Sequence, residues 1–306
     1  MILITGATGF IGSKLVDLLL DKGFSIAVLC LPNEINKVRK TFHKVKVFKG
    51  DILKKDTLKK AFRNTDTVVH LAGIISYKRE MKQKLLDVNW IGTRNVVEMC
   101  KEHRIKKIIF SSSVSVYGEI EKDSIADESY RTKPVNWYGK SKLMAEGEVI
   151  DSELEYVILR FAPVYGKGSN QWLKNLEMLE KGFPLPKTKN YTHVLSVYNA
   201  VNALKNCIEK GYGIYNIADS VPIPFVKLAS MIMKKLGKKP RFVPSWMFNL
   251  LTLIHGVQTY TKVLVMNRNY SIERAKREIN YKPVERLNQD IEEIIKWYKC
   301  EQNFSL

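Results

Sequence analysis

Short apolar runs alternate with amphipathic stretches through the first half of the chain, as alternating strands and helices require. The runs that predict strands are at residues 1–4, 26–31, 45–49, 67–71, 107–112 and 156–161. Helical spacing of apolar residues begins after residue 10 and recurs at 58–62, 85–102 and 138–150. We therefore expect an α/β fold, a Rossmann-type doubly wound parallel sheet covered by helices.

The second half of the chain is less regular and is punctuated by proline. Helices are predicted at residues 172–180, 197–210, 225–236 and 287–298, and a late strand at 213–217. We expect residues 1–163 to form the sheet domain and residues 164–306 to form a smaller, mainly helical subdomain that binds the substrate. Strands near residues 194–217 are candidates to return to the first domain.

A glycine-rich turn follows the first predicted strand. Gly6, Gly9 and Gly12 are spaced three residues apart, and the helical pattern overlaps the last of them. Glycines here allow a close backbone approach to a diphosphate, and the helix N-terminus offers free N–H groups to the anion. An ordinary turn can have the same composition, but the position between the first strand and the first helix predicts a dinucleotide-binding loop.

A tyrosine and a lysine stand four residues apart in the helix predicted at 138–150. Tyr138 and Lys142 are separated by about one helical turn, so their side chains share a face. An ammonium near a phenol favours the phenolate and lowers the pKa of the tyrosine. Such a pair suits proton transfer at an alcohol or carbonyl carbon, although the spacing also occurs by chance in many helices.

Composition and charge narrow the classes of function. The chain has 306 residues, and its four cysteines are scattered without metal or redox spacing, which fits a reducing compartment and no metal site. The net charge is +19, and residues 33–63 supply +8 of it, with eleven Lys or Arg against three Asp or Glu. No nucleic-acid-binding module accompanies these residues, so we expect a solvated basic surface that attracts anionic ligands and no nucleic-acid partner.

Neither a signal peptide nor a membrane span is predicted. The first apolar run is too short for a signal peptide, and the run at residues 246–254 is too short to span a bilayer. We expect the second run to be a subdomain helix, with contact to a membrane surface as the alternative because basic residues lie beside it. A cytoplasmic location is the corresponding expectation.

Several ordered motifs together resemble the extended short-chain dehydrogenase/reductase family, which includes nucleotide-sugar epimerases. Besides the glycine loop and the Tyr138–Lys142 pair, they are Gly50-Asp51-Ile52, His70-Leu71-Ala72-Gly73, Asn89-x-x-Gly92-Thr93, Ser111-Ser112-Ser113 and residues 160–166. The resemblance covers nearly the whole chain and implies NAD or NADP as cofactor. The cofactor-binding residues that it implies are Gly6, Gly9, Phe10, Ile11, Gly12, Asp51, Ile52, Leu71, Ala72, Gly73, Asn89, Ser111, Tyr138, Lys142 and Val164.

The resemblance also implies three catalytic residues. Tyr138 exchanges a proton with the substrate oxygen while hydride moves between the substrate carbon and the nicotinamide. Lys142 lowers the pKa of Tyr138 and holds the nicotinamide ribose. Ser113 polarises the substrate oxygen, and Ser112 is the neighbouring alternative. His70 is interpreted as a strand-end histidine and not as a catalyst or metal ligand.

The choice between NAD and NADP depends on residues near the end of the second strand. An acid there usually accepts hydrogen bonds from the NAD ribose, and a nearby Arg favours the NADP phosphate. Cys30 and Leu31 occupy these positions, so both signals are missing. Glu34 is a candidate for the ribose, and Lys37 and Arg39 are candidates for a phosphate, which leaves NAD favoured slightly.

The residues after 163 carry the substrate signal. Three motifs resemble a bacterial subgroup of nucleotide-sugar 4-epimerases and 4-keto reductases: residues 166–170, 182–186 and 196–201. Pro163 replaces an Asn that many such epimerases use near the diphosphate, and residues 190–193 lack the usual Arg. Binding of a diphosphate then depends on other residues, such as Lys167, Lys187 or Lys189.

The resemblance predicts a nucleotide-sugar 4-epimerase or 4-keto reductase. Dehydratases of the family carry an Asp-Glu pair after the catalytic hydroxyl residue, where Val114 and Ser115 stand here, so dehydration is not expected. The alternatives are a reductase or dehydrogenase of a non-nucleotide ketone or alcohol, steroid-like or flavonoid-like, and a non-catalytic cofactor-binding regulatory protein. Family analogy also implies a homodimer.

Overall fold

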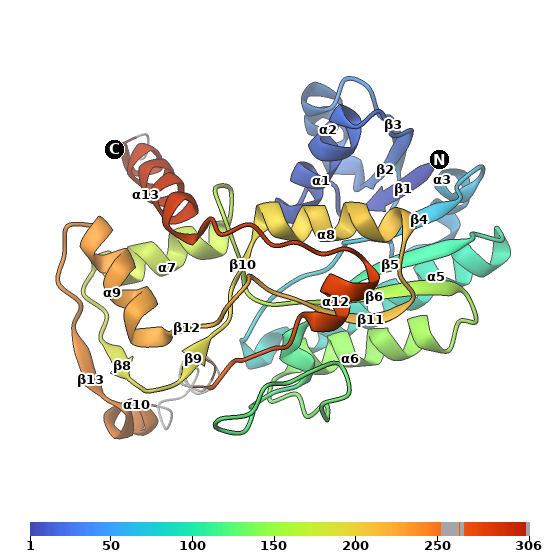
Figure 1. The fold of residues 1–306 in the computed structure, drawn as a ribbon. Helices are drawn as coiled ribbons and strands as arrows, with labels where there is room; N and C mark the ends of the chain where they lie inside the picture. Colours follow the sequence, from blue (N-terminus) through green and yellow to red (C-terminus); the bar gives the residue numbers. More distant parts are fainter. Residues whose placement is uncertain (252–262, 264–265, 304–306) are drawn as a thin grey trace.

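A seven-stranded parallel sheet lies at the centre of the computed structural model, which describes residues 1–251, 263 and 266–303 (Figure 1). The strand order is β11-β6-β5-β4-β1-β2-β3. The strands are β1 (Ile2–Thr5), β2 (Ile26–Cys30), β3 (Lys46–Lys49), β4 (Thr67–His70), β5 (Lys107–Ser113), β6 (Glu155–Phe161) and β11 (Gly213–Ile217). The chain builds outward from β1 in one direction and then restarts at β4 on its other side. The crevice between β1 and β4 is therefore the expected ligand position.

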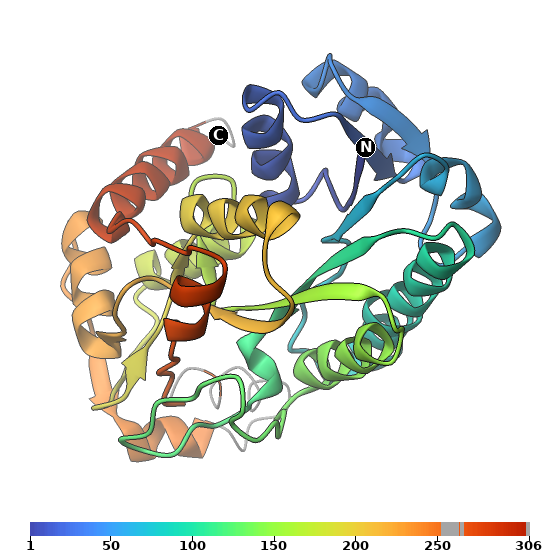
Figure 2. The same ribbon diagram turned by 45° about the vertical axis from the view of Figure 1, so that its right-hand side comes forward.

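Helices cover both faces of the sheet (Figure 2). Each face has its own apolar core. One core includes residues of α1 (Phe10–Asp21), α2 (Ile35–Thr41), α8 (Val197–Glu209) and α12 (Glu273–Glu278). The other includes residues of α3 (Lys59–Phe62), α5 (Gly92–Glu102) and α6 (Trp137–Ile150). Strands such as β1 and β2 are buried along their whole length because both faces are covered.

A third apolar core holds the subdomain together. It joins α7 (Asn170–Glu180), α9 (Phe225–Lys235) and α13 (Leu287–Asn303). Three short strand pairs connect these helices: β7 (Val164–Tyr165) with β10 (Leu195–Ser196), β9 (Tyr191–Thr192) with β12 (Ile223–Pro224), and β8 (Leu185–Lys187) with β13 (Phe242–Pro244). The last strand leads into α10 (Ser245–Leu251).

The predicted fold class is confirmed, and the predicted strands of the sheet lie within one residue of the observed bounds. The helical stretch expected at 85–102 is confirmed, and within it a π-helix at Leu86–Ile91, which was not predicted, joins α4 (Lys82–Leu85) to α5. Both β11 and α8 follow residue 163, yet β11 pairs with β6 and α8 packs on α1. Of the apolar run at 246–254, residues 252–254 lie outside the described residues.

Candidate active site

The glycine loop joins β1 to α1 at the crevice. Gly6 has a φ of +70°, and a Cβ atom there would lie 2.6 Å from the backbone nitrogen of Ala72. A Cβ atom on Gly12 would lie 2.2 Å from the carbonyl oxygen of Gly6, so glycine is required for the turn to fold back this tightly. Gly9 is the N-cap of α1, whose first N–H groups are free to bind an anion. The predicted cofactor residues of this loop are Gly6, Gly9, Phe10, Ile11 and Gly12.

The segment after β4 lies directly against this loop. The N–H of Leu71 donates to the carbonyl oxygen of Thr5 at 3.2 Å, and that of Ala72 donates to the Thr5 hydroxyl at 3.2 Å. His70 is fully buried, and its two ring nitrogens form hydrogen bonds with the hydroxyls of Thr5 (2.7 Å) and Thr93 (3.0 Å). Burial lowers the pKa of His70 to about 3, so the ring is neutral. The interpretation of His70 as a strand-end residue agrees with these contacts.

The ammonium of Lys142 lies at the ends of β4 and β5. Its Nζ donates to the carbonyl oxygen of Ser111 at 2.7 Å. A Cβ atom on Gly73 would lie 3.4 Å from this Nζ and 3.0 Å from the Oδ1 of Asn89, so the missing side chain leaves Lys142 approachable. Asn89 is fully buried in the π-helix and donates to the Ser141 hydroxyl at 3.0 Å. It thereby fixes the π-helix to α6, next to Lys142.

Tyr138 is held beside Ser113 by the way α6 begins. The Asn136 side chain caps the helix by accepting from the N–H of Gly139 at 2.8 Å. A Cβ atom on Gly139 would lie 2.4 Å from the carbonyl oxygen of Ser115, so this glycine lets α6 approach the turn after β5 closely. The Ser113 side chain lies close enough to Tyr138 to lower the pKa of its phenol, and the Ser113 hydroxyl donates to the Ser115 hydroxyl at 3.2 Å. The structure therefore brings the predicted acid/base and its predicted polarising hydroxyl together.

The ionisation of this pair differs from the sequence-based expectation. Burial raises the pKa of Tyr138, the edge-on ring of Tyr77 raises it further, and the Ser113 side chain acts in the opposite direction. Burial also lowers the pKa of Lys142 to about 8, partly opposed by Glu146. In this structure burial outweighs the lowering of the Tyr138 pKa that was expected from Lys142.

Ser112 takes part in a different, structural network. Its hydroxyl donates to Glu146 at 2.5 Å, and Glu146 forms an ion pair with Arg160 at 2.7 Å. The side chains of Glu146 and Arg160 are only 1% and 5% exposed. This network leaves Ser113 as the hydroxyl beside Tyr138. The role of Glu146 was not predicted, although it lies one turn beyond Lys142 on α6.

The predicted adenine contacts lie after β3, at the other end of the sheet. The carboxylate of Asp51 accepts from the N–H of Leu53 at 2.9 Å, so part of it closes a local turn. Ile52 is 8% exposed, and its side chain packs where a Cβ atom on Gly92 would lie. The structure does not place these residues near Tyr138, which agrees with an extended dinucleotide reaching from β3 to β5.

Glu34 reaches back to the glycine loop. Its carboxylate accepts from the Thr8 hydroxyl at 2.8 Å and from the N–H of Leu31 at 3.1 Å. Burial raises the pKa of the Cys30 thiol, Glu34 raises it further, and Arg39 lowers it, so both charges lie near the end of β2. Glu34 is thus an acid close to the end of β2, where dinucleotide-binding folds hold a ribose. The side chain of Lys37 lies outside the described residues.

The backbone of Arg268, from far along the chain, lies against the segment at residues 190–193, and its guanidinium donates to the carbonyl oxygen of Val263. The N–H of Arg268 donates to the carbonyl oxygen of Tyr191 at 3.0 Å, and the charge of Arg268 lowers the pKa of Tyr77. Arg268 therefore lies between the segment that lacks the usual Arg and the Tyr138 neighbourhood. Sequence reasoning missed it because the contact spans 77 positions. Val164 lies in β7, and its carbonyl oxygen accepts from the indole of Trp172 at 3.1 Å.

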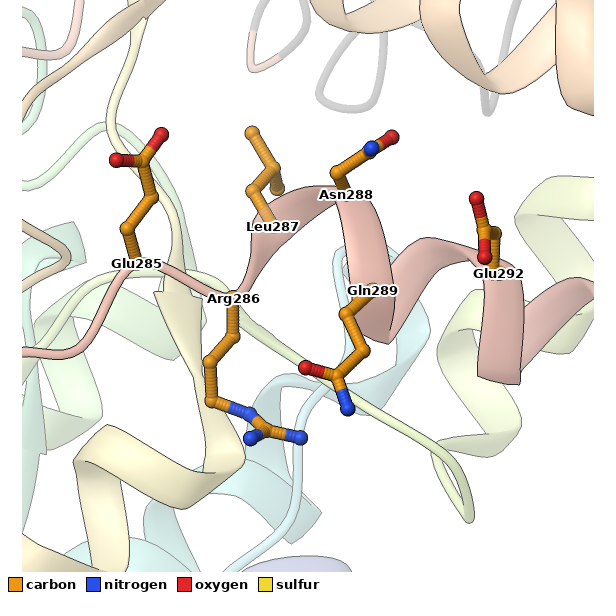
Figure 3. Close-up of a pocket in the computed structure, with 6 residues that line it drawn as sticks. All are labelled: Glu285, Arg286, Leu287, Asn288, Gln289 and Glu292. Carbon is orange, nitrogen blue, oxygen red and sulfur yellow. The ribbon is translucent and has the colours of Figure 1, made fainter.

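One surface hollow lies at α13, and another lies next to Tyr138. One, of about 350 Å³, is formed by the start of α13, where Arg286 and Gln289 point away from Leu287 and Asn288 (Figure 3). None of the predicted site residues lines it. The other, of about 140 Å³, lies next to Tyr138. It is lined by Ser76, Tyr77, Lys78, Arg79, Val135, Asn136, Trp137 and Lys140. No group of three His, Cys, Asp or Glu side chains within the described ranges is placed to hold a metal ion.

The arrangement fits a nicotinamide dinucleotide. The glycine loop leaves no side chain between the start of α1 and an incoming diphosphate, and Glu34 supplies an acceptor beside it. At the other end, Gly73 leaves the Lys142 ammonium approachable.

Comparison with known proteins agrees with this fit. The model of the NAD-dependent epimerase/dehydratase family matches residues 2–183, which is more than half of the chain. The chain belongs to this family. The match confirms the predicted family resemblance and makes the protein an NAD-dependent enzyme of the short-chain dehydrogenase/reductase type, as expected for the cofactor.

Two curated relatives and one solved structure describe the range of the family near this chain. The sterol-4-alpha-carboxylate 3-dehydrogenase (decarboxylating) of Bos taurus is 27% identical and covers 96% of this chain and 91% of its own. The UDP-glucose 4-epimerase of Vibrio cholerae is 27% identical, and the alignment covers 94% of this chain and 92% of the epimerase. The crystal structure of UDP-glucose 4-epimerase from Thermotoga maritima has a TM-score of 0.79 at 23% identity and covers 98% and 99%. This last likeness confirms the fold.

No helix in the described part of this family member is both long and apolar enough to cross a membrane.

Proposed function

We propose that the protein is an NAD-dependent nucleotide-sugar 4-epimerase or 4-keto reductase. The observation that carries this proposal is that buried Tyr138 lies beside Ser113, with the Lys142 ammonium bound to the carbonyl oxygen of Ser111 on the same strand. The UDP-glucose 4-epimerase of Vibrio cholerae, aligned over nearly the whole chain, supports the substrate class. Arg268 supports it further, because its backbone pairs with the segment where the family Arg is missing and its charge lowers the pKa of Tyr77, next to Tyr138.

In this proposal the chain positions and moves one proton at the substrate oxygen. NAD, when bound, accepts a hydride from the substrate carbon and can return it. Tyr138 accepts the hydroxyl proton on its Oη as the hydride leaves, and it donates that proton to the carbonyl oxygen when the hydride returns. Ser113 donates a hydrogen bond to the same oxygen, and the Lys142 ammonium stabilises the phenolate. The raised pKa of Tyr138 favours the proton-donating direction.

With NAD bound, return of the hydride to the opposite face of the ketone would give an epimer, and release after one transfer would give a reduced or oxidised product. The same three residues serve both outcomes. The expected division into residues 1–163 and 164–306 belongs to this proposal, with the second part holding the nucleotide. So do a cytoplasmic location and a homodimer formed through the helices flanking Tyr138.

A second candidate is a dehydrogenase or reductase of a steroid-like ketone or alcohol. The Bos taurus sterol-4-alpha-carboxylate 3-dehydrogenase, which covers 96% of the chain, favours it. Tyr138, Lys142 and Ser113 would perform the same proton transfer on this substrate. The two candidates differ in whether a diphosphate is bound, and hence in whether Arg268 contributes to substrate affinity.

The deciding experiment is a binding and turnover screen of UDP-, GDP- and dTDP-sugars and of a 3-hydroxysterol, each with NAD and NADPH. Epimerised sugar without net change in the cofactor supports the lead. An Arg268→Gln variant should raise the KM for the nucleotide sugar without changing cofactor affinity. If no nucleotide sugar binds at millimolar concentration while the sterol is oxidised, the second candidate replaces the lead.

A further inference from the structure

One face of α10 is apolar and open to solvent. Trp246, Met247 and Leu250 are 64%, 40% and 55% exposed. At 100° per residue these three positions fall within an arc of about 100°, so they form one continuous stripe. Three large apolar side chains on a single exposed helical face are unusual on a monomeric surface and mark an interaction site. We call this stripe the α10 face.

The opposite side of α10 is firmly attached to the subdomain. Phe248 is fully buried, and its ring lies edge-on to Phe183 with the centroids 6.3 Å apart. The Ser245 hydroxyl donates to the carbonyl oxygen of Lys187 at 2.7 Å. Figures 1 and 2 both place α10 at an outer end of the subdomain, on the side away from α13. The α10 face therefore lies opposite the side by which the helix is attached to the subdomain.

The strand β13, which leads to this helix, and its partner β8 follow or lie in two basic stretches of the chain. Residues 181–191 and 234–241 carry eight Lys or Arg and no Asp or Glu. Lys187 is exposed and pairs in register with Pro244, immediately before α10, and Arg241 is exposed just before β13. Two other lysines of these stretches form ion pairs, Lys181 with Glu177 and Lys235 with Glu292.

The combination selects one kind of partner. A second copy of the chain would bring the same positive charges against these, whereas an anionic headgroup layer complements them. Tryptophan at the boundary places its ring in the interfacial region, with methionine and leucine reaching the acyl chains. We propose that the α10 face docks the protein onto a lipid bilayer that contains anionic headgroups. This docking does not depend on the proposed substrate.

The test is co-sedimentation of the full-length protein with vesicles of phosphatidylcholine alone or mixed with phosphatidylglycerol. The wild type should bind the mixed vesicles more tightly, and high salt should weaken the binding. Trp246→Glu should reduce the partition coefficient at least tenfold, roughly as loss of a large interfacial side chain requires. Arg241→Ala should reduce it about fivefold at low salt.

Tyr212→Glu is the matched control, because Tyr212 is 60% exposed and lies at the edge of the central sheet instead of on the subdomain. It should bind vesicles as the wild type does. The proposal is overturned if the wild type fails to bind the mixed vesicles or if Trp246→Glu binds them equally well. It is also overturned if sedimentation velocity shows that Trp246→Glu dissociates a dimer, because the α10 face then covers a second copy.

Discussion

The hydroxyl of Thr8, in the glycine loop, donates to the carboxylate of Glu34 at 2.8 Å, across the end of β2. Glu34 also accepts from the N–H of Leu31, so its carboxylate is fixed beside the glycine loop. The usual acid position at the end of β2 is Cys30. An acid supplied from four residues later therefore occupies the neighbourhood in which a ribose hydroxyl would be recognised.

This contact predicts how the protein distinguishes NAD from NADP. Glu34→Ala should weaken NAD binding about 10- to 100-fold, as loss of a hydrogen bond to a charged group requires. The same change removes a negative charge that repels a 2′-phosphate, so the preference for NAD should narrow. Calorimetric titration of both dinucleotides measures this preference. Glu285→Ala is the control, because Glu285 is an exposed glutamate. An unchanged NAD/NADP ratio would remove Glu34 from this role.

Tyr138→Phe tests the proposed acid/base. The variant keeps the ring and its edge-on contact with Tyr77 but loses the proton at Oη. Turnover should fall about 10²- to 10⁴-fold, while NAD affinity stays within about twofold. Single-turnover kinetics measures the loss of turnover, and cofactor titration measures the affinity for NAD. Turnover close to that of the wild type would contradict the assignment.

Ser113 and Ser112 form a natural control pair. Ser113→Ala should reduce kcat about 10²-fold with little change in melting temperature, because it removes a donor at the substrate oxygen. Ser112→Ala should leave kcat almost unchanged but lower the free energy of unfolding by about 1–3 kcal/mol, because Glu146 loses one buried partner. Urea unfolding and steady-state kinetics separate the two effects. The interpretation fails if the two substitutions have the same profile.

The buried ammonium of Lys142 predicts a basic limb in the pH profile. Its pKa of about 8 in the folded chain lies below the ordinary 10.5, so the ammonium is present below pH 8 and lost above it. The kcat/KM should fall as pH rises through about 8. Stability has the opposite sign: between pH 8 and 10.5 the unfolded chain binds more protons, so the free energy of unfolding rises with pH.

Lys142→Met isolates this group. It should abolish most turnover and yet stabilise the fold at neutral pH by on the order of 1 kcal/mol, because it removes a buried charge. Its unfolding free energy should lose the rise between pH 8 and 10.5. A variant less stable than the wild type at pH 7 would mean that the bond to Ser111 outweighs the cost of burial.

The Glu146–Arg160 ion pair predicts a large stability effect away from the chemistry. Arg160→Leu leaves Glu146 buried without its partner and should cost about 3–5 kcal/mol. Adding Glu146→Gln should recover part of that loss, because the orphaned charge is gone. Chemical denaturation of both variants measures the difference. No recovery in the double variant would argue against an uncompensated charge as the cause.

Most of the sheet domain could be predicted from the sequence, because the patterns that indicate its strands and helices are local. Apolar runs identify the strands, and Asn136 and Gly139 explain why α6 begins where it does. The rest depends on contacts that no local pattern records. The π-helix that carries Asn89, the backbone of Arg268 beside residues 190–193 and the dominance of burial over charge at Tyr138 all arise when distant segments pack together.

The pairing of β11 with β6 has a consequence for how the molecule comes apart. Because β11 arrives from beyond α7 and α8, a gene cut after residue 163 would strip the sheet of its last strand and α1 of the helix that packs on it. The fragment would be left with β6, a largely buried apolar strand, as an open edge that invites pairing with other chains. If a protease cut the chain between β6 and β11, the two fragments would stay associated, because each contributes strands to the same sheet.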